Sequence, residues 1–331
     1  MLNIIKHIPK ELIDCDISDL NHILKGPTLI HIEGIEKEPL LISTLLHGNE
    51  TTSFFVLQKL LKDFEDKKPQ RDIIFFVGNT MAASQGLRQL PGQIDYNRIW
   101  KKGDAPEYKM AQEIYNYVSE FRPFANIDLH NNTGNNPYYA CVNKIDSKFL
   151  KLASLFSKKI VYFTEPSEVE SMMFSKLCPS VTIEAGIAGR EEATIEVYNY
   201  IHKVLELKDF IITSENKGLN VYHTIARIVV DQKMKVDFNN SLDNAEISFL
   251  KDIDDLNFSM VMPGQSIGKV INESAIKVVD NNKKDITPIF LKIEDNNIIA
   301  EQSFIPSMFT KNVEVMKSDC LGYVMEKILS V

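Results

Sequence analysis

The sequence has few cysteines, and none of them lie close together. The four are Cys15, Cys141, Cys178 and Cys320, and no pair is spaced as Cys-x-x-Cys. This argues against a disulfide framework and against a zinc ribbon, because both need cysteines in close sets. We therefore expect reduced thiols, as in a cytoplasmic protein.

Long apolar runs and a surplus of basic residues are also missing. No stretch approaches the roughly 20 apolar residues of a membrane-spanning helix, and the charged start MLNIIKHIPKELID does not resemble a signal peptide. The formal net charge of −8 argues against binding to nucleic acids or anionic membranes, which needs a basic face. A locally positive pocket for a small anion remains compatible with it. The sequence therefore predicts a soluble, cytoplasmic protein.

The composition is that of an ordinary globular protein. Of the 331 residues, 44% are hydrophobic, enough for one large domain or two domains. Through the first two-thirds of the chain, strand-like and helix-like segments alternate, which predicts an α/β fold with a mixed, mostly parallel sheet flanked by helices. A long irregular stretch, residues 80–104, interrupts the alternation and is of a length that is often functional. The expected strands are 28–34, 39–48, 72–79, 125–131, 138–143, 160–165 and 180–186, and the expected helices are 49–66, 105–120, 146–158 and 191–207.

The sequence pattern changes after residue 207. A polar segment, 214–220, has the composition of a linker, and short strands broken by Asn, Asp and Gly follow it. This pattern predicts a catalytic-type α/β domain over residues 1–210 and a smaller β-rich domain over 211–331. We expect a final helix at 320–329.

Four polar side chains stand out at or near the ends of predicted strands. His47 and Glu50 lie where a strand passes into a helix, His130 ends the strand of NIDLHN, and Glu184 follows VTI in another strand. In open α/β sheets, ligands bind at the carboxyl edge of the strands. A catalytic zinc commonly has two histidines and one glutamate as ligands, with one position left open. His47, Glu50 and His130 are the candidate zinc ligands, and Glu184 is the candidate general base.

Each of these residues also has a plainer interpretation. His47 and Glu50 are compatible with a capped turn at a helix start, because charges there interact with the helix dipole. His130 is compatible with a hydrogen-bonded core histidine, and Glu184 with a buried ion pair. Arginines in the 80–104 stretch are suited to bind a carboxylate or to stabilise an oxyanion. The alternative there is a solvated loop with a local pair between Asp95 and Arg98.

Four short motifs, in order, resemble the succinylglutamate desuccinylase/aspartoacylase branch of the zinc carboxypeptidase clan. They are HGNE (47–50), DYNR (95–98), DLHNNTG (128–134) and TIEAG (182–186). The resemblance implies one zinc ion per chain on the three candidate ligands, and Glu184 as general base and acid. It implies that Arg88 polarises the scissile carbonyl and that Asn97 and Arg98 bind the α-carboxylate of the substrate. It also implies an orienting role for Asp128 and a later β domain that partly covers the active site.

The sequence departs from this family pattern in two places. Tyr96 replaces the leucine of the usual Asp-Leu-Asn-Arg motif. The arginine that aspartoacylase-like enzymes carry about ten residues before the catalytic glutamate is replaced by Phe174, and Lys176 is the only nearby cation. N-acetylaspartate is therefore a doubtful substrate, and Lys176 is the candidate replacement. Met172, Met173 and Phe174 either line an apolar pocket or belong to the core.

Taken together, the sequence predicts a zinc-dependent amidohydrolase that releases an amino acid from a small anionic N-acyl form. A metallocarboxypeptidase that cleaves a peptide C-terminus would use the same residues and stays open. So does a metal- or ligand-binding protein without catalysis. The acyl group, the amino acid and the oligomeric state are not specified by the motifs.

Overall fold

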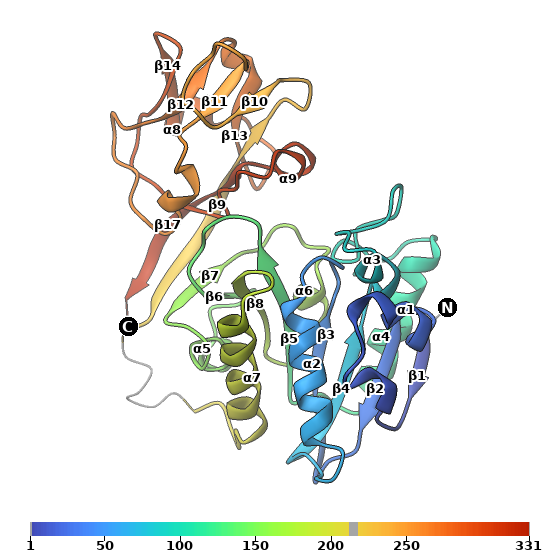
Figure 1. Ribbon diagram of the computed structural model, residues 1–331. Coiled ribbons are helices and arrows are strands. Elements are labelled where there is room, and N and C mark those ends of the chain that lie inside the picture. Colours follow the sequence, from blue (N-terminus) through green and yellow to red (C-terminus); the bar gives the residue numbers. More distant parts are fainter. Residues whose placement is uncertain (1, 212–217, 331) are drawn as a thin grey trace. The chain divides into compact units, whose positions relative to one another are not determined.

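The computed structural model describes residues 2–211 and 218–330, which form two compact units (Figure 1). The first unit comprises the described residues of Met1–Asn131 and Tyr138–Leu219, and the second comprises Asn132–Pro137 and Asn220–Ser330. The boundary at 210/211 stays a prediction, and most of the linker expected at 214–220 lies outside the described residues. None of the described helices combines the length and apolar character that crossing a bilayer requires.

A mixed sheet forms the centre of the first unit, with strands in the order β1-β2-β4-β3-β5-β8-β6-β7. Among the pairings with a described register, β2–β4 and β6–β8 are antiparallel and the others are parallel. The predicted α/β fold with a mostly parallel sheet is therefore confirmed. The strands are β1 (Asn3–Ile5), β2 (Thr28–Ile32), β3 (Glu36–Thr44), β4 (Arg71–Val77), β5 (Ala125–Asn132), β6 (Tyr139–Val142), β7 (Lys159–Tyr162) and β8 (Ser180–Ile187).

Helices cover both faces of this sheet (Figure 1). On one face, Leu41 and Ile74 of the sheet pack in one core with Ile114 of α4 and Phe174 of α6. The alternate residues of β3 and β4 are equally buried and point to the opposite face, where α2 and α7 pack against each other. The helices are α1 (Leu20–Leu24), α2 (Thr52–Asp63), α3 (Thr80–Ser84), α4 (Pro106–Glu120), α5 (Ser147–Ser154), α6 (Glu170–Phe174) and α7 (Glu191–Leu205), with short 3-10 turns η1 (Lys10–Leu12) and η2 (Ile17–Asp19).

The stretch 80–104 is less irregular than the sequence predicted. It opens with α3, whose first turn is capped by Asn79, because the Asn79 side chain accepts a hydrogen bond from the Ala82 N–H at 3.3 Å. Further along, Tyr96, Ile99 and Trp100 are buried in the core that contains α4. The stretch is thus anchored at its start by α3 and again at residues 96–100.

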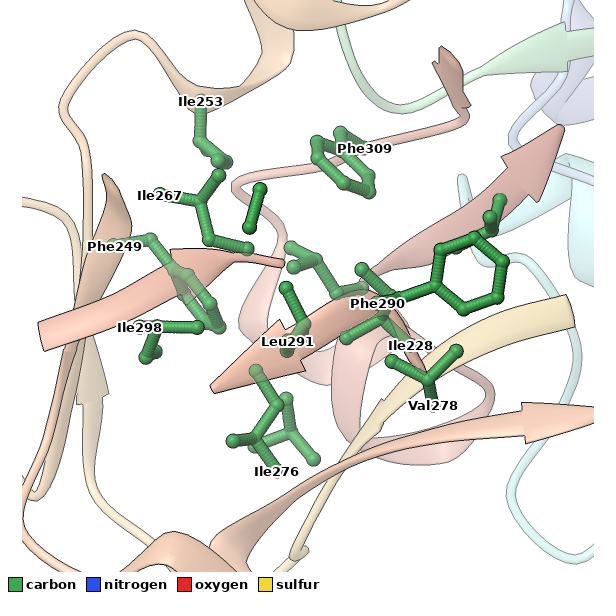
Figure 2. Close-up of a cluster of buried hydrophobic side chains, with 14 of the residues drawn as sticks. Ile228, Phe249, Ile253, Ile267, Ile276, Val278, Phe290, Leu291, Ile298 and Phe309 are labelled. Carbon is green, nitrogen blue, oxygen red and sulfur yellow. The ribbon is translucent and has the colours of Figure 1, made fainter. Parts of the chain in front are cut away.

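The second unit is β-rich, as predicted. In one sheet, β9 pairs antiparallel with both β13 and β17, and β17 pairs with β16. A second sheet has the order β10-β11-β12-β15-β14. Apolar side chains such as Phe249, Ile276 and Val278 fill the core of this unit (Figure 2). The elements are β9 (Asn220–Val230), β10 (Val236–Asp237), β11 (Ile247–Phe249), η4 (Ile253–Leu256), β12 (Ser266–Val270), η5 (Glu273–Ala275), β13 (Ile276–Asp280), α8 (Thr287–Phe290), β14 (Leu291–Glu294), β15 (Asn297–Ala300), β16 (Ile305–Ser307), α9 (Val313–Ser318) and β17 (Gly322–Ser330).

The helix expected at 320–329 is wrong, because this segment is the strand β17. It pairs with β9 from Gly322, opposite Ile228, to Ser330, opposite Asn220. The local sequence includes good helix formers, but pairing along a long neighbouring strand overrides that weak preference. The last described helix is instead α9, which precedes the strand.

Candidate functional site

The turn between β3 and α2 places His47 and Glu50 and is held against the stretch that carries Arg88. A Cβ atom on Gly48 would lie 2.3 Å from the backbone nitrogen of Ala83, so only glycine fits this close approach. The Gly48 N–H donates a hydrogen bond to the carbonyl oxygen of Arg88 at 2.9 Å. The glycine of HGNE therefore fixes the backbone of Arg88 next to the turn.

The three predicted metal ligands meet in one buried group. His47 Nδ1 lies 2.8 Å from Glu50 Oε1, and His130 Nδ1 lies 2.8 Å from Glu50 Oε2. One ligand atom from each of the three side chains can be chosen so that all lie within 4.8 Å of one another. His130 comes from β5, whereas the other two come from the turn after β3, and β3 and β5 are adjacent parallel strands. The parallel pairing brings the two strand ends to the same edge.

The outer nitrogens of both histidines are held by carboxylates. His47 Nε2 lies 3.0 Å from Asp95 Oδ1, and His130 Nε2 lies 3.0 Å from Asp128 Oδ2. Metal-binding histidines usually donate their second ring N–H in this way, which fixes the ring and its tautomer. Because both Nδ1 atoms then face Glu50, the group fits a divalent metal with a His₂Glu ligand set, as in catalytic zinc sites.

Sequence reasoning anticipated an orienting role for Asp128 but not for Asp95. For Asp95 the sequence suggests only a local pair with Arg98, three residues later. Its place at the head of the DYNR motif was the available signal. The Asp95 carboxylate contacts His47, the N–H of Asn97 at 2.6 Å and, at 3.5 Å, Arg88, while its backbone carbonyl oxygen accepts from the Arg98 N–H at 2.9 Å.

The charges within the group support the ionised form of Glu50. Burial by itself would raise the pKa of Glu50, but the neighbouring His47 and His130 charges outweigh burial and hold that pKa below its usual range. For His130, burial would lower the pKa, while Asp128 and Glu50 raise it well above its usual range. An ionised carboxylate is the form that ligates a metal.

Glu184 lies within electrostatic reach of this group. It is buried on β8, opposite Tyr139 of β6. Burial raises the pKa of Glu184 to about 8; Glu50 adds to the increase, whereas His130 and Arg88 oppose it. A carboxyl group that titrates near neutral pH is suited to take up and give back a proton.

Arg88 sits at the accessible side of the ligand group. Its Nη1 donates to Glu50 Oε1 at 3.2 Å, and its Nη2 lies 2.9 Å from His47 Nε2. The side chain is 33% exposed, whereas Glu50 is 8% exposed. The guanidinium group therefore lies beside the ligands and is still reachable from solvent.

The remaining predicted residues, Asn97, Arg98 and Lys176, differ in their burial and in their contacts. Asn97 is buried; its Oδ1 accepts from the Glu170 N–H at 2.9 Å, and its Nδ2 lies 3.2 Å from His130 Nε2. Arg98 is half-buried and donates to the Asn97 carbonyl oxygen at 3.0 Å. Lys176 is exposed, and its described contact is to the sulfur of Met173 at 3.8 Å rather than to the ligand group.

Of the two interpretations of the apolar segment before Glu184, the core interpretation holds for Phe174. This side chain is fully buried, and its ring packs against Trp100 at a centroid distance of 5.6 Å and against Tyr115 at 5.8 Å. Met173 is partly buried against the same core. The position of the missing arginine is thus filled by a core residue.

A second buried carboxyl group, Glu170, was not anticipated from the sequence. Its Oε1 accepts from Ser43 Oγ at 2.7 Å, and its Oε2 accepts from Asn126 Nδ2 at 2.8 Å. Burial raises the pKa of Glu170 well above its usual range, and the charge of Asp128 raises it further. The available signal was Asn126 itself, a polar residue inside an apolar strand. Glu170 links α6 to β3 and β5, beside the residue that contacts His130.

Comparison with known proteins identifies the family. The model of the succinylglutamate desuccinylase/aspartoacylase catalytic domain matches residues 36–211. The chain belongs to this succinylglutamate desuccinylase/aspartoacylase family. The matched range contains every candidate ligand and catalytic residue named above, from His47 to Glu184. The family resemblance of the four motifs is therefore confirmed.

Individual relatives of the family agree with this assignment. The succinylglutamate desuccinylase of Pseudomonas fluorescens (strain SBW25) is 33% identical over 102 residues, which cover 28% of this chain and only 30% of that protein. The crystal structure of succinylglutamate desuccinylase from Chromobacterium violaceum has a TM-score of 0.57 at 16% identity, covering 89% of this chain and 87% of that one. Murine aminoacylase 3 has a TM-score of 0.59 at 16% identity, covering 89% and 96%. At such identities the two structures show a shared fold.

Proposed function

We propose that this protein is a zinc-dependent amidohydrolase that releases an amino acid, or a close analogue, from a small anionic N-acyl form. The observation that carries the proposal is the meeting of His47, Glu50 and His130 in one buried group with Glu184 in reach. Membership of a family named for a desuccinylase and an aspartoacylase supports the same reaction class.

In this proposal, His47, Glu50 and His130 hold one zinc ion per chain. Bound there, zinc supplies a Lewis acid that polarises a carbonyl oxygen and acidifies a water molecule. Glu184 accepts the proton of the attacking water and delivers it to the departing amine nitrogen, for which its raised pKa is suited. Arg88 donates N–H groups to the oxyanion that develops on the carbonyl.

The anionic end of the substrate needs a cation near this group. Arg98 is the proposed anchor, because a guanidinium group binds a carboxylate through two parallel hydrogen bonds. Asn97 is proposed to assist, although its carboxamide contacts Glu170 and His130 in the described structure. Binding of a carboxylate by Asn97 would therefore require its side chain to turn outward. Lys176 is proposed to contact a second carboxylate where the substrate has one.

The test is amine release from a matched panel of N-acyl amino acids and short peptides, with zinc supplied and with the chelated protein as control. Turnover of acyl amino acids alone would support the deacylase. Turnover of peptides would favour a metallocarboxypeptidase with the same residues. No turnover across the panel, by a protein that binds zinc stoichiometrically, would contradict the proposal and favour a binding protein.

A further inference from the structure

Asn131, the residue after the ligand His130, contacts both the segment that carries His47 and Glu50 and the segment that carries Glu184. It is 7% exposed. Its backbone N–H donates to Glu50 Oε2 at 3.1 Å. Its side-chain Oδ1 accepts from the Thr52 N–H at 3.3 Å, and its Nδ2 donates to the carbonyl oxygen of Gly186 at 3.0 Å. The Ala185 carbonyl oxygen lies at 3.5 Å from the same nitrogen.

These contacts join three segments that are distant in sequence. Thr52 opens α2, two residues after Glu50, and Gly186 lies two residues after Glu184 on β8. The carboxamide therefore spans from the start of α2 to the end of β8, while its own backbone continues from His130. One side chain thus connects the segment that carries two ligands with the segment that carries the general base.

We propose that Asn131 is a positioning residue that sets the place of Glu184 relative to the metal ligands. The inference rests on the proposed amidohydrolase function. Asparagine suits this role because its carboxamide offers both an acceptor, used by Thr52, and a donor, used by Gly186. Aspartate would keep the acceptor but would set a charged oxygen against the carbonyl oxygens of Ala185 and Gly186. Alanine would remove both bonds.

We expect substitution of Asn131 to change turnover rather than metal binding. Glu50 is held by the backbone N–H of residue 131, which every substitution except proline keeps. The side chain, by contrast, holds the backbone just after Glu184. A displacement of a catalytic group by about 1 Å can cost about a hundredfold in rate. Loss of the side chain should therefore lower kcat and leave zinc affinity and KM nearly unchanged.

The experiment compares Asn131→Ala and Asn131→Asp with Asn143→Ala, a control at an asparagine that is buried to a similar degree, 8% exposed. We expect kcat to fall about 10- to 100-fold in both Asn131 variants, with KM within about threefold and zinc content unchanged. The control should stay within about threefold of wild type. Wild-type kcat in both Asn131 variants, or loss of zinc from them, would overturn the proposal. If Asn131→Ala does not fold, Asn131→Asp keeps the Thr52 bond and carries the test.

A second readout separates this inference from the proposed function. Amide hydrogen exchange across Glu184–Ile187 should be about tenfold faster in Asn131→Ala than in Asn143→Ala, whether or not a substrate is known. An unchanged exchange rate in this segment would overturn the positioning role. A wild-type protein that turns over nothing in the panel would contradict the function, and the exchange result would still decide whether Asn131 holds the segment of Glu184.

Discussion

The two units of the molecule bury polar groups for different purposes. In the first unit, Glu50, Asp128 and Glu184 are buried, and the side chains of Glu50 and Asp128 contact those of His47 and His130. In the second unit, the core drawn in Figure 2 is apolar. One buried polar side chain of this unit, Asn257, bonds to backbone: its Oδ1 accepts from the Phe309 N–H at 2.8 Å, and its Nδ2 donates to the Phe309 carbonyl oxygen at 3.0 Å.

This contrast supports the proposal that the chemistry takes place in the first unit. Burying a charged group costs several kcal/mol unless it is paired, so a cluster of ionisable side chains is a poor way to stabilise a fold. A carboxamide that satisfies backbone groups has no such cost beyond ordering it. We therefore expect substitutions in the first cluster to change activity more than stability, and substitutions in the second core to do the reverse.

The largest effect should come from His47→Ala. Removing one of three ligands should abolish stoichiometric zinc binding, and turnover should fall by about 10⁴-fold or more because the metal-dependent steps are lost together. Metal analysis of the purified protein and turnover on the responsive substrate measure both. His22→Ala, at an exposed histidine, is the control. A His47→Ala protein with one zinc per chain would show that the ligand assignment is wrong.

Glu184→Gln should have the next largest effect and should separate catalysis from metal binding. The amide keeps the shape of the side chain but cannot take the proton of water, so kcat should fall about 10²- to 10⁴-fold. Zinc content should stay at one per chain. Glu206→Gln, at an exposed position after α7, should behave as wild type. Near-normal kcat in Glu184→Gln would require another general base.

Strand geometry explains which residues of this site could be predicted from the sequence. His47, His130 and Glu184 are each a polar residue at or near the end of an apolar strand, and a sheet with parallel neighbours brings such ends to one edge. Glu50 follows from the short turn that carries His47. The motif residues were therefore recognisable without coordinates.

The partners of these residues were harder to predict, because they depend on the path of the connecting chain. The sequence offers a local pair of Asp95 with Arg98 as one alternative; the Arg98 N–H does bond to the Asp95 carbonyl oxygen, but the contact of the Asp95 side chain with His47 could not be predicted. Glu170 and Asn131 owe their contacts to segments dozens of residues away. The error at β17 has the same origin, since local preference indicated a helix and pairing with β9 decided otherwise.

Phe249→Ala tests the comparison of the two units by a substitution in the core of the second unit. Phe249 is fully buried among apolar side chains, and replacing such a residue with alanine typically costs about 3–5 kcal/mol. Denaturant unfolding should show this loss, while zinc affinity below the transition should stay within about twofold. Ile271→Ala, at a side chain that is 59% exposed, should change the stability by less than about 0.5 kcal/mol. Loss of zinc from folded Phe249→Ala would contradict the separation of roles.

The smallest effect should come from Lys176→Ala, which tests an exposed side chain of the first unit against the residues of its buried cluster. An exposed ammonium group interacts with a carboxylate by only about 0–1 kcal/mol. We therefore expect unchanged kcat and a KM increase of at most about threefold for substrates that carry a second carboxylate, measured against the same acyl amino acids without it. Lys102→Ala, also exposed, is the matched control. A KM increase well beyond threefold, limited to the dicarboxylic substrates, would show that Lys176 replaces the missing arginine. Substrate specificity would then be decided by an exposed side chain rather than by the buried cluster.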